Sequence, residues 1–427
     1  MLTRVAPVGH IAEVILVRNE EGIAAKLPSP VSDGFSAYMR GRLAEDIPMY
    51  AERIDAESAV AHHLGATLAL DSCYGVTPSE KANSIRKGLS ACGVYHRHLS
   101  RLLFSREGEG SGLPSLVVTG GLVEPGAALA TLRLAGEGIS ILGGRGLTPE
   151  RGIPGGLTSG LSEEEIKRLR EIAESLLQFA IGLEDGFLRS AALWVKGEGF
   201  EVPIPSLALV DEDGKSSLFD GELRLVDPDG VLIARGTEDV LSAIEGTPYR
   251  VGVLARLNVA GGIPTQKGEE ALERLWDGLG APPIHRVSAG YWGTVVELIE
   301  AAEVLIEALA GMTPGDDDLR TPLDEPGEGV GAIESADGTL IHRYSLDPDG
   351  IVEEAEVILP AEGRRAEVET GLAVALGEAG EIDEPLIERI ELVIRAFQPA
   401  LVPEAPFPLR ITLRGEDGGV IEEWRRG

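Results

Sequence analysis

Cysteine is almost missing from this 427-residue sequence, which contains only Cys73 and Cys92. Two cysteines cannot build a disulfide framework, and they cannot supply the ligand set of a zinc or iron–sulfur site. We therefore expect this chain to hold no metal cluster and no resident cofactor of its own.

Basic residues are also scarce, because 38 lysines and arginines stand against 70 aspartates and glutamates, for a formal charge of −32. This excess of acids excludes nonspecific binding to the phosphates of nucleic acids. Seven lysines and 4 % aromatic residues complete a composition that resembles proteins kept soluble in a salt-rich cytosol. The charge therefore indicates habitat and solubility rather than a reaction.

Long uncharged runs are absent. The most apolar helical stretch, 291–312, carries Glu297, Glu300, Glu303 and Glu307, and no run reaches the roughly 18 residues that span a bilayer. Residues 1–20 lack the apolar region of a signal peptide. We expect a cytoplasmic protein without a membrane partner, and 43 % hydrophobic residues give it ample core.

Apolar periodicity predicts an alternation of small β-regions and long helices. Ser79 can cap a helix that begins near Glu80, and Ser162 with Glu165 forms a capping box for a second helix. The other predicted elements are a hairpin at 10–27, a three-strand meander at 202–234 with two Asp-Gly turns, helices at 267–278, 288–311 and 385–396, a β-rich stretch at 331–359 and a hairpin at 409–424.

We expect one domain, 1–427. Its predicted sub-regions are an N-terminal β region (1–45), a first helical core (46–200), a β meander (201–248), a second helical core (249–312), an acidic loop (313–330) and a β/α C-terminal region (331–427). The best candidate for a linker is 313–328. Its adjacent acids, Asp316 to Asp318, lack the spacing of a calcium loop and favour a solvated loop.

Common site motifs fail in turn. Gly214-Lys215-Ser216 lacks the first glycine of a phosphate loop, and the glycine-rich run at 143–146 does not join a strand to a helix. His62-His63 and the pair His96/His98 have no third ligand at a metal-site spacing. These histidines are expected in the core or on the surface.

Several stretches nevertheless match one family in order along the chain. They are Gly34-Phe35 with Gly41-Arg42, Ala51-Glu52-Arg53-Ile54, Gly143-Gly144-Arg145 with Pro154-Gly155-Gly156, the run from Tyr249 to Asn258 (YRVGVLARLN), and Gly331-Ala332-Ile333-Glu334 with Gly338-Thr339-Leu340-Ile341-His342. Together they resemble the large subunit of nickel–iron hydrogenases, especially the cytoplasmic group that works with viologen, deazaflavin or heterodisulfide-reductase partners. The resemblance implies an α+β fold with a long-helix core and small peripheral β-sheets.

The metal-binding motifs of that family are degenerate here. Its first motif, R-I-C-G-x-C-P-x-x-H, falls on 53–62, where Asp55 and Ser58 replace the cysteines. Its last motif, D-P-C-x-x-C-A-x-H, falls on 398–406, where Ala400 and Pro403 stand in their place. The family uses four thiolates to hold nickel and iron, and these side chains are not soft sulfur donors.

Supporting positions have changed as well. The arginine of the family's A-P-R-G turn, which lies over the cluster and helps to activate dihydrogen, corresponds to Asp337, so the charge is reversed. The proton-relaying glutamate near the N-terminus corresponds to Val8. The glutamate and histidine that would bind magnesium or iron beside the C-terminus correspond to Ser36 and Pro406.

We therefore expect a non-catalytic, metal-free relative that acts as a structural or regulatory component of a cytoplasmic redox complex. The resemblance implies an iron–sulfur small subunit as partner, and a homo-oligomer is the alternative. Hydrogenase activity is expected to be absent. The degenerate cavity would be formed by Asp55, Glu57, Ser58, His62, Asp337, Ala400 and Pro403.

Two other hypotheses concern that cavity. It could hold a new small molecule or redox group, as in the quinone-site subunit of respiratory complex I, which resembles a cysteine-less member of the same fold. Alternatively, Asp55, His62 and Glu404 could bind a hard divalent ion. We prefer the simpler interpretation that His62 is a hydrogen-bonded core histidine and that Asp55 caps its helix.

Two structural expectations follow. Carboxylates brought together at Asp55, Glu57 and Asp337 should be protonated, paired with arginine or hydrated, because buried like charges repel. The tail should be retained rather than removed by the family's processing protease, because 408–424 alternates around an Asp-Gly turn like a hairpin with a buried face.

Overall fold

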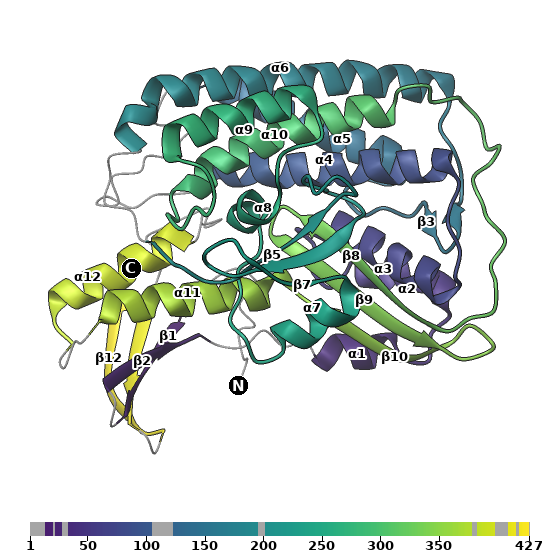
Figure 1. Cartoon of the computed structure of the whole chain (residues 1–427). Coiled ribbons are helices and arrows are strands. Elements are labelled where there is room, and N and C mark those ends of the chain that lie inside the picture. Colours follow the sequence, from purple (N-terminus) through teal and green to yellow (C-terminus); the bar gives the residue numbers. More distant parts are fainter. Residues whose placement is uncertain are drawn as a thin grey trace.

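Long helices form one layer of the protein, and small sheets lie beneath it (Figure 1). This computed structural model describes residues 13–19, 22–27, 33–104, 123–194, 201–377, 382–397, 409–415 and 418–426. The α+β architecture expected from the sequence is confirmed.

Four long helices pack together in the upper layer, with a fifth against one of them. They are α4 (Glu80–Phe104), α5 (Pro125–Gly143), α6 (Glu163–Trp194), α10 (Ala289–Ala308) and, beside α10, α9 (Gln266–Leu279). The predicted starts of α4 and α6 are confirmed. The Ala82 amide donates to Ser79 Oγ at 3.1 Å, and Glu165 N and Ser162 Oγ close the capping box at 3.2 Å.

Helix α3 (Ala59–Cys73) lies across a three-stranded sheet in the order β10-β9-β8. The strands are β8 (Glu328–Ser335), β9 (Gly338–Leu346) and β10 (Val352–Ile358). A Cβ added at Gly331 would lie 2.2 Å from the backbone nitrogen of Ala69. Glycine in β8 therefore lets the helix backbone rest directly on the strand.

Short elements complete this half of the molecule. Before α3 come α1 (Asp33–Met39), the 3₁₀ turn η1 (Ala44–Asp46) and α2 (Ile47–Ala51), and after α5 comes the small hairpin β3 (Gly152–Ile153) and β4 (Gly156–Leu157). The acidic segment 313–328 is not a free linker. It forms backbone bridges from Gly315 to Leu161 and from Arg320 to Gly156, and it buries Leu319.

The predicted meander is present as β5 (Ser206–Val210), β6 (Glu222–Val226) and β7 (Leu232–Arg235). It is followed by α7 (Thr237–Ile244) and α8 (Val253–Val259). Helix α8 contacts both β5 and α10, so it connects the meander to the helical layer.

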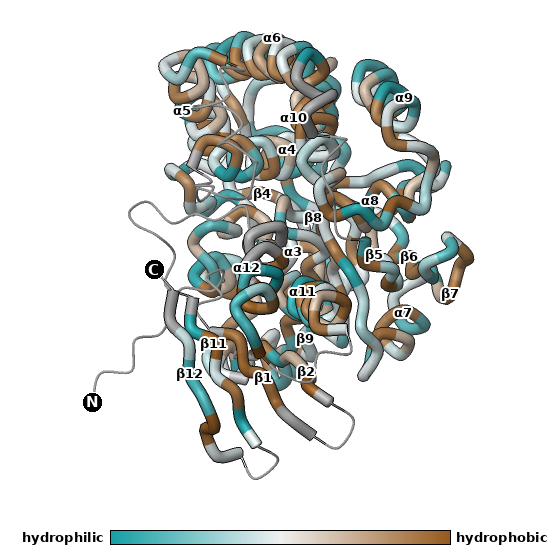
Figure 2. Tube along the Cα trace, turned by 90° about the vertical axis from the view of Figure 1, so that its left-hand side faces the viewer, coloured by the Kyte–Doolittle hydropathy of each residue, from teal (hydrophilic) through white to brown (hydrophobic). Residues whose placement is uncertain are grey.

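The two ends of the chain share a sheet with the order β12-β11-β1-β2. Strand β1 (Glu13–Asn19) pairs with β2 (Gly22–Lys26) and, in parallel, with β11 (Leu409–Arg414), which pairs with β12 (Val420–Arg426). Helices α11 (Pro360–Leu376) and α12 (Glu384–Phe397) cover one face (Figures 1 and 2). Buried side chains of β1 and β11 join those helices in one apolar cluster.

No helix among the described residues combines the length and the apolar character that crossing a bilayer requires. The sequence did not predict α1, α7 or α11, and it did not distinguish α5 and α8 as separate helices within the predicted helical cores 46–200 and 249–312. The predicted hairpin at 409–424 is confirmed as β11 and β12, whereas retention of the tail in the native protein stays a prediction.

Deleting residues 407–427 should lower the melting temperature, because it removes β11 and β12 and exposes the apolar cluster under α11 and α12. Thermal unfolding would measure this, together with the intact mass of the native protein. As a matched pair, Ile411→Ser (1 % exposed) should destabilise the protein, whereas Ile421→Ser (55 % exposed) should not. A native mass that ends near residue 406, or an unchanged melting temperature, would show that the tail is dispensable.

Candidate functional site

The loop before α3 contains Asp55, Glu57 and Ser58. Asp55 Oδ1 accepts the Glu57 amide at 3.0 Å, so Asp55 closes a turn ahead of the helix. It does not cap α3, because Ser58 occupies the N-cap position, and the expected capping role of Asp55 is wrong. The Ser58 hydroxyl instead donates to Asp337 Oδ2 at 3.4 Å.

Asp337 lies in the tight turn between β8 and β9. Ser335 Oγ accepts the Asp337 amide at 3.1 Å and donates to the Gly338 carbonyl at 2.9 Å. Gly338 has φ +130°, and a Cβ there would lie 2.5 Å from Val251 Cγ2. Only glycine fits this conformation and space, so the backbone fixes where the Asp337 carboxylate points.

Three arginines converge on that carboxylate. Arg97 Nε donates to Asp337 Oδ2 at 3.2 Å, while Arg101, also from α4, and Arg364, from α11, reach Oδ1, the latter at 2.6 Å. Arg97 also pairs with Glu57. We call Asp337, Glu57, Ser58 and these three arginines the Asp337 cluster. It joins the loop before α3, helix α4, the β8–β9 turn and α11.

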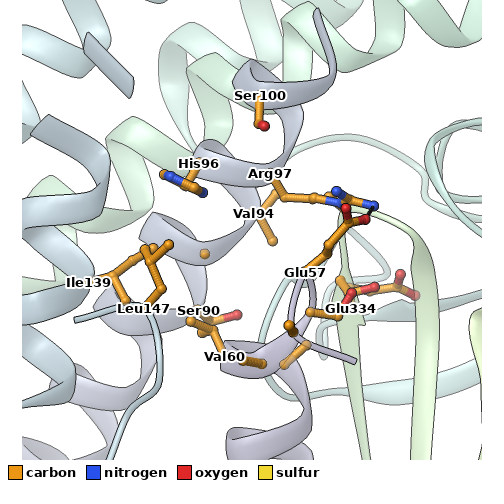
Figure 3. Close-up of a pocket in the computed structure, with 17 residues that line it drawn as sticks. Glu57, Val60, Ser90, Val94, His96, Arg97, Ser100, Ile139, Leu147 and Glu334 are labelled. Carbon is orange, nitrogen blue, oxygen red and sulfur yellow. Dashed lines mark ion pairs between the residues drawn. The ribbon is translucent and has the colours of Figure 1, made fainter. Parts of the chain in front are cut away.

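Two cavities border the cluster, and Ala336 lines both. The first, of about 200 Å³, lies between the start of α3 and the α4 and α5 helices, with the Glu57–Arg97 ion pair at its edge (Figure 3). The second, of about 110 Å³, has Arg101, Asp337 and Arg364 in its wall. The family resemblance places a metal centre at this position. The structure has ion pairs there instead, and the two cavities border them.

Positive charge is concentrated in the cluster. Burial lowers the pKa of the Arg101 guanidinium, and Arg97 and Arg364 lower it further. Burial also lowers the pKa of Arg364, where Glu367 opposes the effect and Arg97 adds to it. A divalent cation at Asp337 would face three guanidinium groups, and this repulsion opposes metal binding.

His62 is buried in the core and lines neither cavity. Its Nδ1 is 3.2 Å from His342 Nε2, and His342 Nδ1 is 2.6 Å from the Tyr344 hydroxyl. Burial lowers the pKa of His62 to about 3, so the ring is neutral. This geometry agrees with a hydrogen-bonded core histidine rather than a metal ligand.

A buried ion-pair network lies behind the β8–β9 turn. Arg256 on α8 makes two bonds of 2.7 Å to Glu297 on α10 and also pairs with Glu334 on β8. His98 on α4 lies 2.7 Å from Glu297 Oε2. Burial alone would raise the pKa of Glu297, but Arg256 and His98 together outweigh this effect and hold the pKa at about 2. This Arg256 network positions the strand from which Asp337 projects.

The predicted site residues therefore separate into groups. Glu57, Ser58 and Asp337 meet through hydrogen bonds and Arg97. Asp55 remains in the adjoining turn, and His62 is elsewhere. Ala400, Pro403 and Glu404 lie outside the described residues. In the part of the chain that is described, no three side chains of His, Cys, Asp or Glu gather closely enough to hold a metal ion.

The three arginines were missed from the sequence. The spacing of Arg97 and Arg101 was a weak indication of a nearby carboxylate, because like charges four residues apart on a helix repel unless an anion lies between them. Arg364 carried no such indication, because nothing in its surroundings on α11 relates it to Asp337.

No family model matches the sequence, but individual proteins do. An iron–sulfur subunit of the F420-non-reducing hydrogenase from Archaeoglobus profundus is 29 % identical, with 92 % of each chain aligned. The corresponding vhc chain of the F420-non-reducing hydrogenase from Methanococcus voltae is 27 % identical over 86 % of each chain. The HoxS beta chain of the NAD-reducing hydrogenase from Cupriavidus necator is 27 % identical, with 98 % of this chain and 97 % of that protein aligned.

This chain is a homologue of nickel–iron hydrogenase large subunits. The solved NAD⁺-reducing [NiFe]-hydrogenase has the same fold, with a TM-score of 0.68 and 22 % identity over 88 % of this chain and 91 % of that chain. A Dm. baculatum [NiFeSe]-hydrogenase gives a TM-score of 0.63 at 17 % identity, covering 90 % of this chain and 94 % of that one. The resemblance and the fold expected from the motifs are confirmed.

Replacing Arg256 of this hydrogenase homologue by Gln should cost about 3–5 kcal/mol of unfolding free energy, because Glu297 and Glu334 would lose their buried partner. Urea unfolding at pH 7 would measure the loss. The control is Arg168→Gln on α6, which breaks a half-exposed pair with Glu137 and should cost less than about 1 kcal/mol. Equal costs for the two variants would contradict a structural role for the Arg256 network.

Glu300 on α10 should make stability depend on pH. Burial, and then the charge of Glu297, raise its pKa to about 8, and neither carboxylate oxygen has a hydrogen-bond partner among the described residues. Its unfolded-state pKa is near 4.5, so between these values the native state keeps a proton that the unfolded state has lost. The free energy of unfolding therefore carries its full value below pH 4.5, falls progressively as pH rises from 4.5 to about 8, and has lost this contribution above pH 8.

Glu300→Gln should therefore match the parent protein near pH 5 and exceed its stability by roughly 2–4 kcal/mol above pH 8.5. Urea unfolding from pH 5 to 9 would measure the difference. Glu273→Gln, at an exposed position of α9, should leave the pH profile unchanged. Parallel profiles for parent and Glu300→Gln would refute the shift.

Proposed function

We propose that this chain is a non-catalytic homologue of nickel–iron hydrogenase large subunits, folded as one domain without a nickel–iron centre. In this proposal it acts as a structural or regulatory component of a cytoplasmic redox complex. The observation that carries the proposal is the Asp337 cluster, in which three guanidinium groups surround the turn where the family resemblance expects an arginine above the metals.

The two cysteines of this chain do not fit a nickel–iron centre either. Four thiolates would be needed, and the sequence contains two cysteines. Cys73 ends α3 with its Sγ 3.5 Å from the Tyr344 carbonyl, and Cys92 is buried in α4. Burial raises the pKa of both thiols to about 12. They are packing residues in the core, and no hydrogenase step is assigned to this chain.

The partner we propose is an iron–sulfur small subunit, and the alternative is a second copy of this chain. Support comes from the relatives, whose names describe subunits of hydrogenases. The long-helix layer and its sheets preserve that fold over nearly the whole chain. In this proposal the conserved fold serves to bind that partner.

Protein purified from its source cell should contain no stoichiometric nickel and should not reduce viologen with dihydrogen, because Asp55 and Ser58 replace thiolates. Elemental analysis and the viologen assay would test this, with an F420-non-reducing hydrogenase as positive control. Mass spectrometry of the same preparation would identify co-purifying subunits. About one nickel per chain, or dihydrogen oxidation by this protein, would overturn the proposal.

A further inference from the structure

Strand β7 forms an open edge of the meander sheet, whose order is β5-β6-β7. At its start, Val231, Leu232 and Ile233 are 61 %, 49 % and 49 % exposed. Nowhere else in the described part of the chain do three consecutive large apolar side chains remain this exposed. In Figure 2 the strand lies at the margin of the molecule, where brown marks apolar sequence. An apolar edge strand of this kind is a template for pairing with another strand.

The backbone of β7 offers hydrogen-bonding groups on the side away from β6. The Asp227 amide donates to the Val231 carbonyl at 2.8 Å, on the β6 side. Neighbouring residues of a strand direct their backbone groups to opposite edges, so the amide and carbonyl of Leu232 point outward. The register of β6 and β7 shifts between Leu225 and Val226. This irregularity limits regular pairing on the outer edge to the few residues around Leu232.

Charge favours a second copy of this chain as the occupant of the edge. The chain carries a net charge of −32, so most surfaces of two copies repel each other. Around β7 the charges balance, because the exposed Asp229 precedes the apolar residues and the exposed Arg235 follows them. If two copies pair antiparallel about Leu232, Asp229 of each copy lies alongside Arg235 of the other. One segment thus supplies both members of each ion pair, which is the self-complementarity of a twofold interface.

The other apolar edge strand, β12, has a different pattern. Val420 and Ile421 are exposed there too, but Glu422 and Glu423 follow them directly. Charged side chains on an edge strand discourage pairing with another strand. Strand β12 is therefore a natural comparison for β7 rather than a second pairing edge.

We propose that β7 is a self-association edge, through which two copies of this chain join their three-stranded meander sheets into one. The two strands run antiparallel, and Leu232 meets its counterpart at the twofold axis, where the two residues exchange backbone hydrogen bonds. Val231 of each copy packs against Ile233 of the other. Because the paired segment is short, the interface is small and the dimer is reversible.

This inference extends the proposed function, in which a second copy of the chain is the alternative partner. None of the residues that it uses belongs to the Asp337 cluster or lines either cavity. The two fail separately, because metal analysis tests the loss of the nickel–iron centre and the oligomeric state tests β7.

Sedimentation velocity of the full-length protein over a range of concentrations would measure the association. We expect a monomer–dimer equilibrium. Leu232→Lys should weaken it at least tenfold, because it places two cations at the twofold axis. Since this side chain is half exposed, the variant should keep the melting temperature of the parent. The matched control is Ile421→Lys on β12, which should leave the dimer unchanged.

A charge exchange tests the orientation of the two strands. Asp229→Arg alone should weaken the dimer, because it places a second cation alongside Arg235 of the other copy. Adding Arg235→Asp to the same chain should restore most of the lost affinity. A double variant as weak as Asp229→Arg alone would refute the intermolecular ion pairs.

Leu232→Cys tests the twofold axis directly. Residues that exchange both backbone bonds lie about 5.5 Å apart between their Cα atoms, a distance that a disulfide spans. Oxidised glutathione should therefore convert this variant to a covalent dimer. The native thiols of Cys73 and Cys92 should not interfere, because burial raises the pKa of each to about 12. The control, Val374→Cys at an exposed position of α11, should give no covalent dimer.

Three outcomes would overturn the proposal. They are a monomer at every concentration, a dimer that Leu232→Lys leaves intact, and a dimer that Ile421→Lys disrupts instead. If the protein dimerises but Leu232→Cys does not cross-link, antiparallel pairing about this residue is wrong.

Discussion

The structure depends on Arg256, which is 2 % exposed and neutralised by Glu297 and Glu334. Removing these charges from water costs several kcal/mol per ion, and only close, well-oriented bonds offset that cost. The pairing therefore fixes the distances between α8, α10 and β8, and His98 adds α4 through Glu297. Because Glu334 is three residues before Asp337, the same network determines where the β8–β9 turn projects.

The Asp337 cluster lies at the β8–β9 turn, which the Arg256 network positions. In the family that the sequence resembles, a metal centre links the loop before α3 to the distant terminal motif. Here the loop before α3, helix α4, the β8–β9 turn and α11 meet through side-chain ion pairs and the Ser58 hydrogen bond. Asp337 in place of arginine makes this possible, since one reversed charge converts a repelling position into the acceptor for three cations. These side-chain contacts thus cross-link four elements around one carboxylate.

Much of the fold could be predicted from the sequence because its signals are local. The Ser79 cap, the Ser162 capping box and the Asp-Gly turns each lie within a few residues of the element that they start or connect. Helix α11 was missed because Glu367, on its buried side, is charged and is paired with Arg250, 117 positions earlier. The arginines of the Asp337 cluster were missed for the same reason. Its partners Arg101 and Arg364 are brought together only by tertiary structure, whereas Glu57 and Ser58 could be named because the motif resemblance pointed to them.

Only seven of the 38 basic residues are lysines. The ion-pair clusters give a structural reason for this preference for arginine. Every cation in the Asp337 cluster and in the Arg256 network is arginine, and Arg256 alone reaches two carboxylates and the Ser335 carbonyl. A lysine ammonium is a single compact charge and cannot maintain that planar set of bonds. Salt shortens the Debye length and weakens ion pairs on the surface, but it screens buried pairs much less. Salt therefore affects the buried pairs of the Arg256 network less than it affects the chain's net charge of −32, so the chain can carry that charge without weakening the network.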